Sequence, residues 1–159
     1  MIKIREVHVK DWEEIKALLE AVVNEVPPVA VELEPLIMKG RMWLRDFPSG
    51  EAGTFVVAEV NNKIVAFCYL AVPKFYRPIA YIGVVVAKEH RKEDIGSQLF
   101  YHVAEWATSR HLEYIIADVW HWNLKSLKFF EKMDFIEKTR FKDKFRGTDE
   151  EKVRLVKKL

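Results

Sequence analysis

The sequence has little of several features that would point to other classes of protein. Cys68 is its one cysteine and lies in an apolar strand pattern, so no internal disulfide can form and a cytoplasmic location is favoured. No run approaches the roughly 18 apolar residues of a membrane-spanning helix, and residues 1–20 lack the apolar core of a secretory signal. We therefore expect no membrane partner and no export.

Strong charge of one sign and the common catalytic motifs are also missing. The formal net charge is only +2, which argues against nucleic acid as the main partner. No Gly-x-Ser-x-Gly or P-loop sequence is present, which disfavours the hydrolase and nucleotidase classes that use them. The histidines are scattered and no Cys/His or paired-carboxylate spacing resembles a metal site, so no metal is expected.

What is present fits one soluble domain over residues 1–159, because half of the residues are hydrophobic and 31% are charged. The segment from Lys138 to Lys158 is locally basic. Its charges alternate with apolar or β-prone residues, which indicates a solvated sheet face. The alternative is a patch that attracts the phosphates of a cofactor or an acidic partner.

Hydrophobic periodicity predicts the element order βα(α)βββαβαββ, a mixed α/β fold in three layers. Asp11 is expected to cap the first helix, with Glu14 in the capping-box position. The predicted strands are residues 2–8, 54–60, 64–72, 81–86, 114–120, 136–145 and 152–158, and tight turns are predicted at 61–63 and 147–149. The later helices are predicted over residues 33–47, 95–111 and 126–133.

The stretch from Ile82 to Phe135 carries the chemistry. A strand that ends at Val86 is followed by the charged loop 90–94 and a helix that begins near Ile95. Unpaired amides at a helix N-terminus and the positive end of the helix dipole form a ready anion site, to which Arg91 and Lys92 add full charges. Gly96 has no Cβ and would let a ligand approach the backbone closely. Many helices begin after a charged loop, so this pattern alone is weak.

Two motifs in register make the pattern specific. The first runs from the valines at 84–86 through Arg91 and Gly96, and the second runs from Val119 through Asn123 and Ser126 to the aromatic pair at 129–130 and Phe135. Together, on the expected elements, they resemble the two signatures of the GNAT superfamily of acetyl-CoA-dependent N-acyltransferases. The order of elements along the whole chain resembles the GNAT domain as well.

The resemblance implies a mixed, mostly antiparallel central sheet flanked by helices, in which the strand ending at Val86 splays from the strand ending at Trp120. The arm of acetyl-CoA, the co-substrate, would lie between these strands, and amides from Arg91 to Ser97 would bind its pyrophosphate. The residues implied in cofactor binding are Val84, Val85, Val86, Arg91, Lys92, Glu93, Asp94, Ile95, Gly96, Ser97, Asn123, Ser126 and Phe130. A homodimer is also compatible with the resemblance.

The acceptor would be a small-molecule amine or an amino group of a peptide or protein, which attacks the thioester directly. The attack needs a neutral amine, and a base five residues before the Asn is typical of some family members, which here is Asp118. Asp118 could equally be a solvated acid or one paired with a basic residue. His121, Tyr81 and Tyr114 are further candidates, because the pKa of an unperturbed histidine suits proton transfer near neutrality and a tyrosine carries a hydroxyl.

Three residues depart from the family pattern, and one of them, Asp134 in place of the glycine before Phe135, concerns only a turn. Asp94 stands where glycine is usual: its carboxylate could repel the pyrophosphate or cap the next helix, although Asp tolerates the positive φ that the loop requires. Phe130 replaces the tyrosine that serves as the acid in the family. A thiolate leaves without much help, because a thiol has a pKa of about 8.5. The alternative to an enzyme is therefore a GNAT-fold binding module with weak or no turnover.

Overall fold

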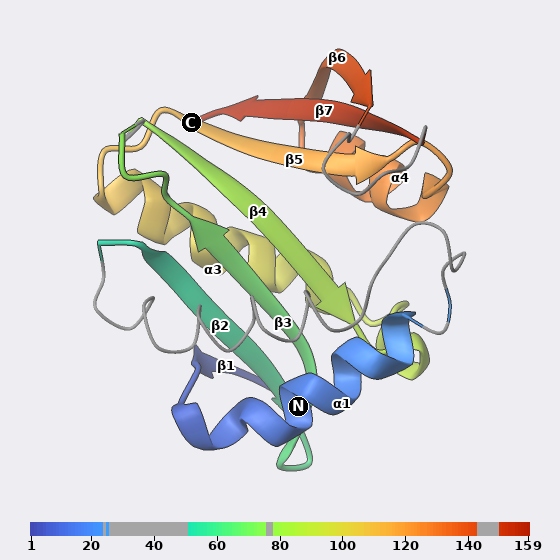
Figure 1. Cartoon of the computed structure of the whole chain (residues 1–159). Helices are drawn as coiled ribbons and strands as arrows, with labels where there is room; N and C mark the ends of the chain where they lie inside the picture. Colours follow the sequence, from blue (N-terminus) through green and yellow to red (C-terminus); the bar gives the residue numbers. More distant parts are fainter. Residues whose placement is uncertain (24, 26–50, 76–77, 143–149) are drawn as a thin grey trace.

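The computed structural model describes residues 1–23, 25, 51–75, 78–142 and 150–159. The described residues form a seven-stranded sheet in the order β1-β2-β3-β4-β5-β7-β6. Its neighbouring strands are antiparallel except for β4 and β5, which run parallel (Figure 1). The prediction of a mixed, mostly antiparallel sheet is confirmed. The strands are β1 (Ile2–Glu6), β2 (Gly53–Val60), β3 (Lys63–Ala71), β4 (Ile79–Val86), β5 (Tyr114–Trp120), β6 (Ile136–Lys142) and β7 (Glu151–Lys158).

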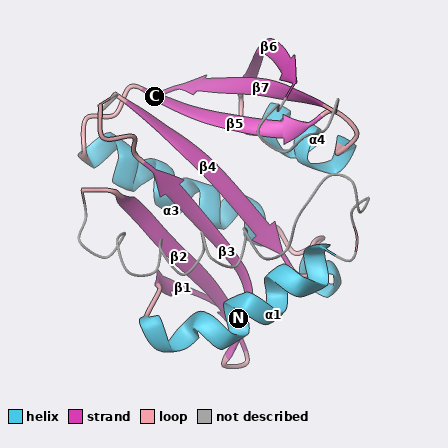
Figure 2. Ribbon diagram, in the orientation of Figure 1, coloured by secondary structure: helices cyan, strands magenta, loops and turns pink. Residues whose placement is uncertain are grey.

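Helices cover both faces of the sheet (Figure 2). Helix α1 (Trp12–Val23) packs on one face and α3 (Ile95–Ser109) on the other, while α4 (Leu124–Lys132) follows β5. Because side chains alternate along a strand, β2 serves two cores: Phe55 and Val57 face α1, whereas Val56 and Ala58 face α3. The sheet is thus the middle of three layers, as the sequence predicts.

The start of the chain differs from the prediction. A 3₁₀ turn (Val9–Asp11) separates β1 from α1, and the Asp11 carboxylate accepts the amide N–H of His8 at 2.7 Å. Asp11 also accepts two hydrogen bonds from Arg5, at 2.8 and 3.0 Å. Glu14 reaches across to the amide of Ile64, at 2.9 Å. The predicted capping box between Asp11 and Glu14 is therefore wrong, because Asp11 is bonded to His8 and Arg5 while Glu14 is bonded to Ile64.

Other boundaries move by a few residues. Helix α4 begins at Leu124, two residues before the prediction, because Asn123 caps it. Strand β5 has the predicted bounds, and the turn between β2 and β3 is confirmed, with positive φ at Asn61 and Asn62. The helix predicted over residues 33–47, the turn at 147–149 and the last residues of the strand predicted over 136–145 lie outside the described residues.

The strands β4 and β5 meet at one end and separate at the other. Their parallel pairing covers only Ile79–Tyr81 with Tyr114–Ile116, which we call the paired end. Both strands continue beyond it, β4 to Val86 and β5 to Trp120, without pairing to each other, and we call this part the open end (Figure 1). The chain after β4 leads into α3, and the chain after β5 leads into α4, so both helices begin beside the open end.

Candidate functional site

The open end presents backbone groups of β4 toward β5. In an antiparallel pair, successive residues turn their N–H and C=O groups alternately toward and away from the partner strand. The Ala87 amide donates to Val65 O of β3, at 2.8 Å, and Val86 stands opposite Ala66. Val84 and Val86 therefore turn their backbone groups away from β3, to the side on which β5 has separated.

The loop after β4 keeps the shape that a glycine would give it. Asp94 has φ 61° and ψ 19°, the left-handed conformation, and its side chain makes no capping hydrogen bond to α3. The first intrahelical bond comes from the Gln98 amide to Asp94 O, at 3.2 Å. The amides of residues 95–97 consequently have no acceptor one turn back. The positive φ expected for Asp94 is present, and the side-chain cap that was one of its two expected roles is not formed.

The two acidic side chains of the loop are held by basic neighbours. Glu93 Oε2 lies 2.8 Å from His90 Nδ1. Asp94 Oδ1 lies 3.8 Å from Lys132 Nζ of α4, in an exposed pair that adds little to stability. Lys92 is exposed. Lys132 thus counters part of the negative charge of Asp94 next to the α3 N-terminus, and Glu93 is hydrogen-bonded to His90.

Arg91 is fixed by two contacts. Its Nε donates to Val86 O at 3.0 Å, which ties the loop to the end of β4. Its two terminal nitrogens donate to the Glu25 carboxylate, at 2.6 and 2.8 Å. Arg91 thus lies where the sequence predicts a cation, and it already has a partner carboxylate just beyond α1.

Gly96 has no side chain, which allows α3 and α4 to pack closely at this position. A Cβ on Gly96 would lie 3.2 Å from a ring atom of Phe129, so the ring of α4 occupies the space on that side. The side chains of Ile95 and Ser97 are also buried, at 1% and 6% exposure. A glycine at position 96 therefore serves the packing of α3 against α4, and the reason given for Gly96 from the sequence is incomplete.

Asn123 and Ser126 form the cap of α4. Asn123 Oδ1 accepts the Ser126 amide at 3.3 Å, and Asn123 O accepts the Leu127 amide at 3.1 Å. The cap places Asn123 directly after the open end of β5. Its side-chain oxygen has a structural task, whereas its NH₂ group can still donate to a ligand.

Phe130 belongs to the core. Its side chain is 5% exposed, and its ring lies 5.1 Å from the ring of Phe129 and 5.0 Å from that of Phe135, centroid to centroid. The edge-to-face arrangement stabilises the packing of α4. Phe130 can therefore offer a ligand an apolar surface and no proton.

Asp118 lies on the open end of β5 and has a basic partner. Both of its oxygens accept from Arg154 of β7, at 2.8 and 2.9 Å. These bonds raise the pKa of Arg154 above its ordinary value. The guanidinium also lies over the ring of Tyr81, 5.8 Å from its centroid, and over that of Phe141, at 5.0 Å. Tyr81, Asp118 and Arg154 thus form one cluster at the point where the strands separate.

The remaining two candidates lie at opposite ends of β5. His121 follows β5, and its Nε2 lies 2.7 Å from Glu150 Oε2. Tyr114 lies at the paired end, opposite Ile79. The structure therefore brings Tyr81 and Asp118 together, places His121 beyond the open end and leaves Tyr114 away from it.

A covalent or metal-assisted route finds no support in the described part of the chain. Cys68 is fully buried, and burial raises the pKa of its thiol, so it carries no ready thiolate nucleophile. Among the described residues, no His, Cys, Asp or Glu side chains gather in groups that could hold a metal ion. No helix in those same ranges is both long and apolar enough to cross a bilayer.

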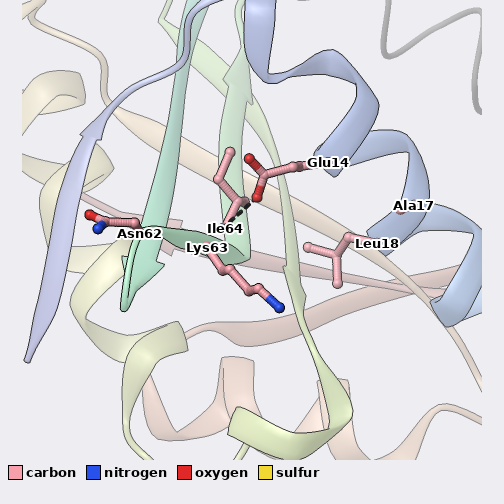
Figure 3. A pocket seen from close by; sticks show the side chains of 6 residues that line it. All are labelled: Glu14, Ala17, Leu18, Asn62, Lys63 and Ile64. Atoms are coloured by element: carbon pink, nitrogen blue, oxygen red, sulfur yellow. Dashed lines mark hydrogen bonds between the residues drawn. The ribbon is translucent and has the colours of Figure 1, made fainter.

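A pocket of about 530 Å³ lies elsewhere, between α1 and the β2–β3 turn (Figure 3). Its size would suit a small ligand. Its carboxylate, Glu14, is hydrogen-bonded to the amide of Ile64, and Leu18 and Ile64 are largely covered. The pocket shares no residue with the open end, and we place the candidate site at the open end because unpaired strand backbone and the N-terminus of α3 lie together there.

Three residues of the site were not singled out from the sequence. Arg154 stands opposite Asp118 in the β5–β7 register, Glu150 meets His121, and Glu25 meets Arg91. Only the alternation of basic residues near the C-terminus hints at Arg154. Each pair joins segments that are far apart in the chain, and no local pattern marks them.

Comparisons with known proteins agree with this geometry. The model of the acetyltransferase (GNAT) family matches residues 15–135. No curated protein sequence is a significant match. Among solved structures, an acetyltransferase of the GNAT family from Streptococcus pneumoniae has a TM-score of 0.83 at 20% identity and full coverage of both chains.

Two further structures share the fold. A PaiA N-acetyltransferase from Thermoplasma acidophilum, in complex with coenzyme A, has a TM-score of 0.83 at 16% identity, covering 100% of this chain and 99% of that chain. A ribosomal-protein-alanine N-acetyltransferase from Brucella melitensis has a TM-score of 0.77 at 22% identity, covering 99% of each chain. The family model spans most of the sequence, and the matched residues include the segment from β4 through α4. The chain therefore belongs to the acetyltransferase (GNAT) family.

Proposed function

We propose that the protein is an N-acetyltransferase that moves an acetyl group from acetyl-CoA to a primary amine by direct attack in a ternary complex. The observation that carries this proposal is the open end of β4 and β5. There, Val84 and Val86 turn backbone groups toward a side that no described strand covers. An extended chain that bears amide groups can bind such an edge as an added strand would.

The residues at the open end fit an acyl-CoA. The backbone of Val84 and the amide of Val86 would hold the arm, which carries amides of its own, whereas Val85 turns its backbone groups toward Phe67 of β3. The amides of 95–97, with Lys92 and the charge of Arg91, would face the diphosphate, because the Asp94 side chain leaves those amides uncapped. Asn123 NH₂ would bond the arm from the β5 side. Acetyl-CoA supplies the activated acetyl group, and the protein supplies position and charge.

The acceptor amine must lose a proton to react, because an ammonium has no lone pair. Asp118, His121 and Tyr81 remain the proposed proton acceptors. Arg154 neutralises Asp118 and occupies both of its oxygens, so Asp118 would also position Arg154 and Tyr81. The pH dependence of the Asp118→Asn, His121→Gln and Tyr81→Phe variants separates these roles: only loss of the base removes the fall in activity on the acidic side of the profile, where the base is protonated.

The leaving thiolate finds no acid at Phe130, whose ring is packed in the core. A thiol with a pKa near 8.5 is a good leaving group, and water can protonate it after departure. We therefore expect turnover without a tyrosine at this position. The Phe130→Tyr variant would show at most a modest gain, because the hydroxyl would be added to a buried ring.

The proposal is tested with the purified protein, acetyl-CoA and a panel of primary amines that includes small molecules and peptide N-termini. We expect release of CoA thiol that depends on one class of amine, with the acetylated product confirmed by mass spectrometry. An absence of acetyl-CoA binding at millimolar concentration would contradict the proposal. The same assay run with gel filtration shows whether the active species is the homodimer that the family resemblance allows.

The second candidate function is a GNAT-fold binding module with weak or no turnover. Two observations favour a binding module: Phe130 is buried, and the carboxylate of Asp94 lies in the loop of residues 90–94, which we call the phosphate loop. Acetyl-CoA binding without acetylation of any amine would support this reading. The Asp94→Gly variant measures how far the carboxylate weakens acetyl-CoA binding, and we expect this variant to bind more tightly.

A further inference from the structure

The carboxylate of Glu25 forms an ion pair with Arg91, the arginine of the phosphate loop. Glu25 lies just beyond the end of α1 and accepts from both terminal nitrogens of Arg91, at 2.6 and 2.8 Å. Each side chain is 29% exposed, so water reaches the pair only in part. Two parallel bonds between a guanidinium and a carboxylate form one of the strongest ion-pair geometries in proteins.

Cations from both sides of the open end act on this carboxylate. The hydrogen bond from Arg91 lowers the pKa of Glu25 against the opposing effect of burial, and the charges of Arg91, Lys88 and Lys125 lower it further. Lys88 follows β4, and Lys125 lies in the first turn of α4, after β5. Positive charges in the segments that follow β4 and β5 therefore act on the same carboxylate, that of Glu25.

We propose that Glu25 is a displaceable internal anion that sets the affinity of the open end for the diphosphate of its acyl-CoA. This inference rests on the proposed function, because it concerns the same site. Glu25 neutralises Arg91 while the arginine Nε stays bonded to Val86 O. A diphosphate that approaches the amides of 95–97 gains the full attraction of Arg91 only when Glu25 moves away, since like charges at close range repel.

Replacement of Glu25 by the diphosphate at Arg91 would also couple cofactor binding to α1. With Glu25 bound, Arg91 joins the end of α1 to the end of β4. A diphosphate would take over the two terminal nitrogens and leave the bond to Val86 intact, so the loop keeps its place while the end of α1 is released. Glu25 thus acts as a specificity-determining residue for the anionic part of the ligand, and it does not take part in the chemistry at the thioester.

The test compares Glu25→Gln with Glu20→Gln. The second variant removes the same charge from α1, and among the described residues Glu20 makes no hydrogen bond or ion pair to residues 90–94. Calorimetry with acetyl-CoA is run at low and at high salt. We expect Glu25→Gln to bind acetyl-CoA about tenfold more tightly at low salt, which corresponds to one surface-type charge interaction. The gain should shrink at high salt. We expect Glu20→Gln to match the unmodified protein.

Weaker or unchanged binding by Glu25→Gln would overturn the inference, because Glu25 would then orient Arg91 for the ligand or play no part in its affinity. The proposed function would stand in that case, since the unmodified protein still binds acetyl-CoA. Failure of the unmodified protein and of Glu25→Gln to bind at millimolar concentration would instead overturn the proposed function. A structure of the complex with acetyl-CoA provides a second readout: Glu25 and Arg91 should separate beyond 4 Å, the limit of an ion pair.

Discussion

The two ends of the β4–β5 pair are built from adjacent residues of the same strands, yet they differ in every property that matters for binding. At the paired end, Ala80 and Ile115 stand opposite each other and are fully buried. At the open end, the backbone of Val84 and Val86 faces no described strand, and the chain runs into charged loops and helix N-termini. We expect the first end to contribute mainly to stability and the second to bind the ligand.

We propose that ending this strand pairing early is what makes the binding site. Three paired positions align the two halves of the sheet, and the strands then follow different partners, β3 for β4 and β7 for β5. The backbone groups exposed in this way need no special side chain. The predictions below separate the two ends, beginning with the largest effect.

At the paired end, Ile115→Ala should lower the free energy of unfolding by about 2–5 kcal/mol, because it leaves a cavity in a fully buried position. Urea unfolding measures the loss, and Ile115→Val should cost only about 0.5–1.5 kcal/mol. The folded variant should keep its affinity for acetyl-CoA. A large loss of affinity in the folded protein would show that the two ends are not separable.

Gly83 lies near the start of the open end, where a Cβ would come within 2.2 Å of the Tyr69 ring. We expect Gly83→Ala to destabilise the protein by about 1–3 kcal/mol, because the ring must move. In a Tyr69→Ala background the same substitution should cost much less, which a double-mutant cycle would detect. An equal cost in both backgrounds would mean that the ring is not what restricts this position.

Asn123 combines a structural and a binding role beyond the end of β5. Asn123→Ala should cost about 0.5–2 kcal/mol through loss of the α4 cap and should also weaken acetyl-CoA binding. Asn123→Ser keeps a capping oxygen but lacks the NH₂ donor, so its stability should recover while its affinity stays low. Normal affinity in the serine variant would restrict Asn123 to the cap.

The Glu25–Arg91 pair should add at most about 1 kcal/mol of stability, since it is partly exposed. The folded protein holds the pKa of Glu25 below its ordinary 4.5, so the contribution is present above that pH and is lost as the pH falls through the folded value. The stability difference between the unmodified protein and Glu25→Gln should therefore vanish in acid. A difference that stays constant as the pH falls until Glu25 is protonated in the folded protein would indicate a cause other than this ionisation.

Local patterns carry much of the fold. The apolar run at residues 114–120 predicts β5 with its observed bounds, because a strand covered on both faces has a continuous apolar sequence. The conformation of Asp94 also follows from residue type, since Asp tolerates positive φ. The valines at 84–86 and Arg91 lie where the sequence motifs predict them, beside the open end.

Long-range partners are what the sequence does not reveal. Asp118 could be a free base or a paired acid until its strand is set beside β7, where Arg154 lies 36 residues further along the chain. Glu25 and Arg91 are 66 residues apart, and Glu14 and Ile64 are 50 apart. Such contacts depend on the packed sheet and helices, so a helix-cap rule applied to Asp11 and Glu14 gave the wrong partners.

Amide hydrogen exchange, followed by NMR with and without saturating acetyl-CoA, tests most directly whether the open end binds the cofactor. The account predicts slower exchange at Val84, Val86 and residues 95–97, because their amides gain acceptors from the ligand. Exchange at the paired end, residues 79–81 and 114–116, should be unchanged apart from any global stabilisation. Unchanged exchange at the open end, or protection confined to the pocket between α1 and the β2–β3 turn, would contradict the account.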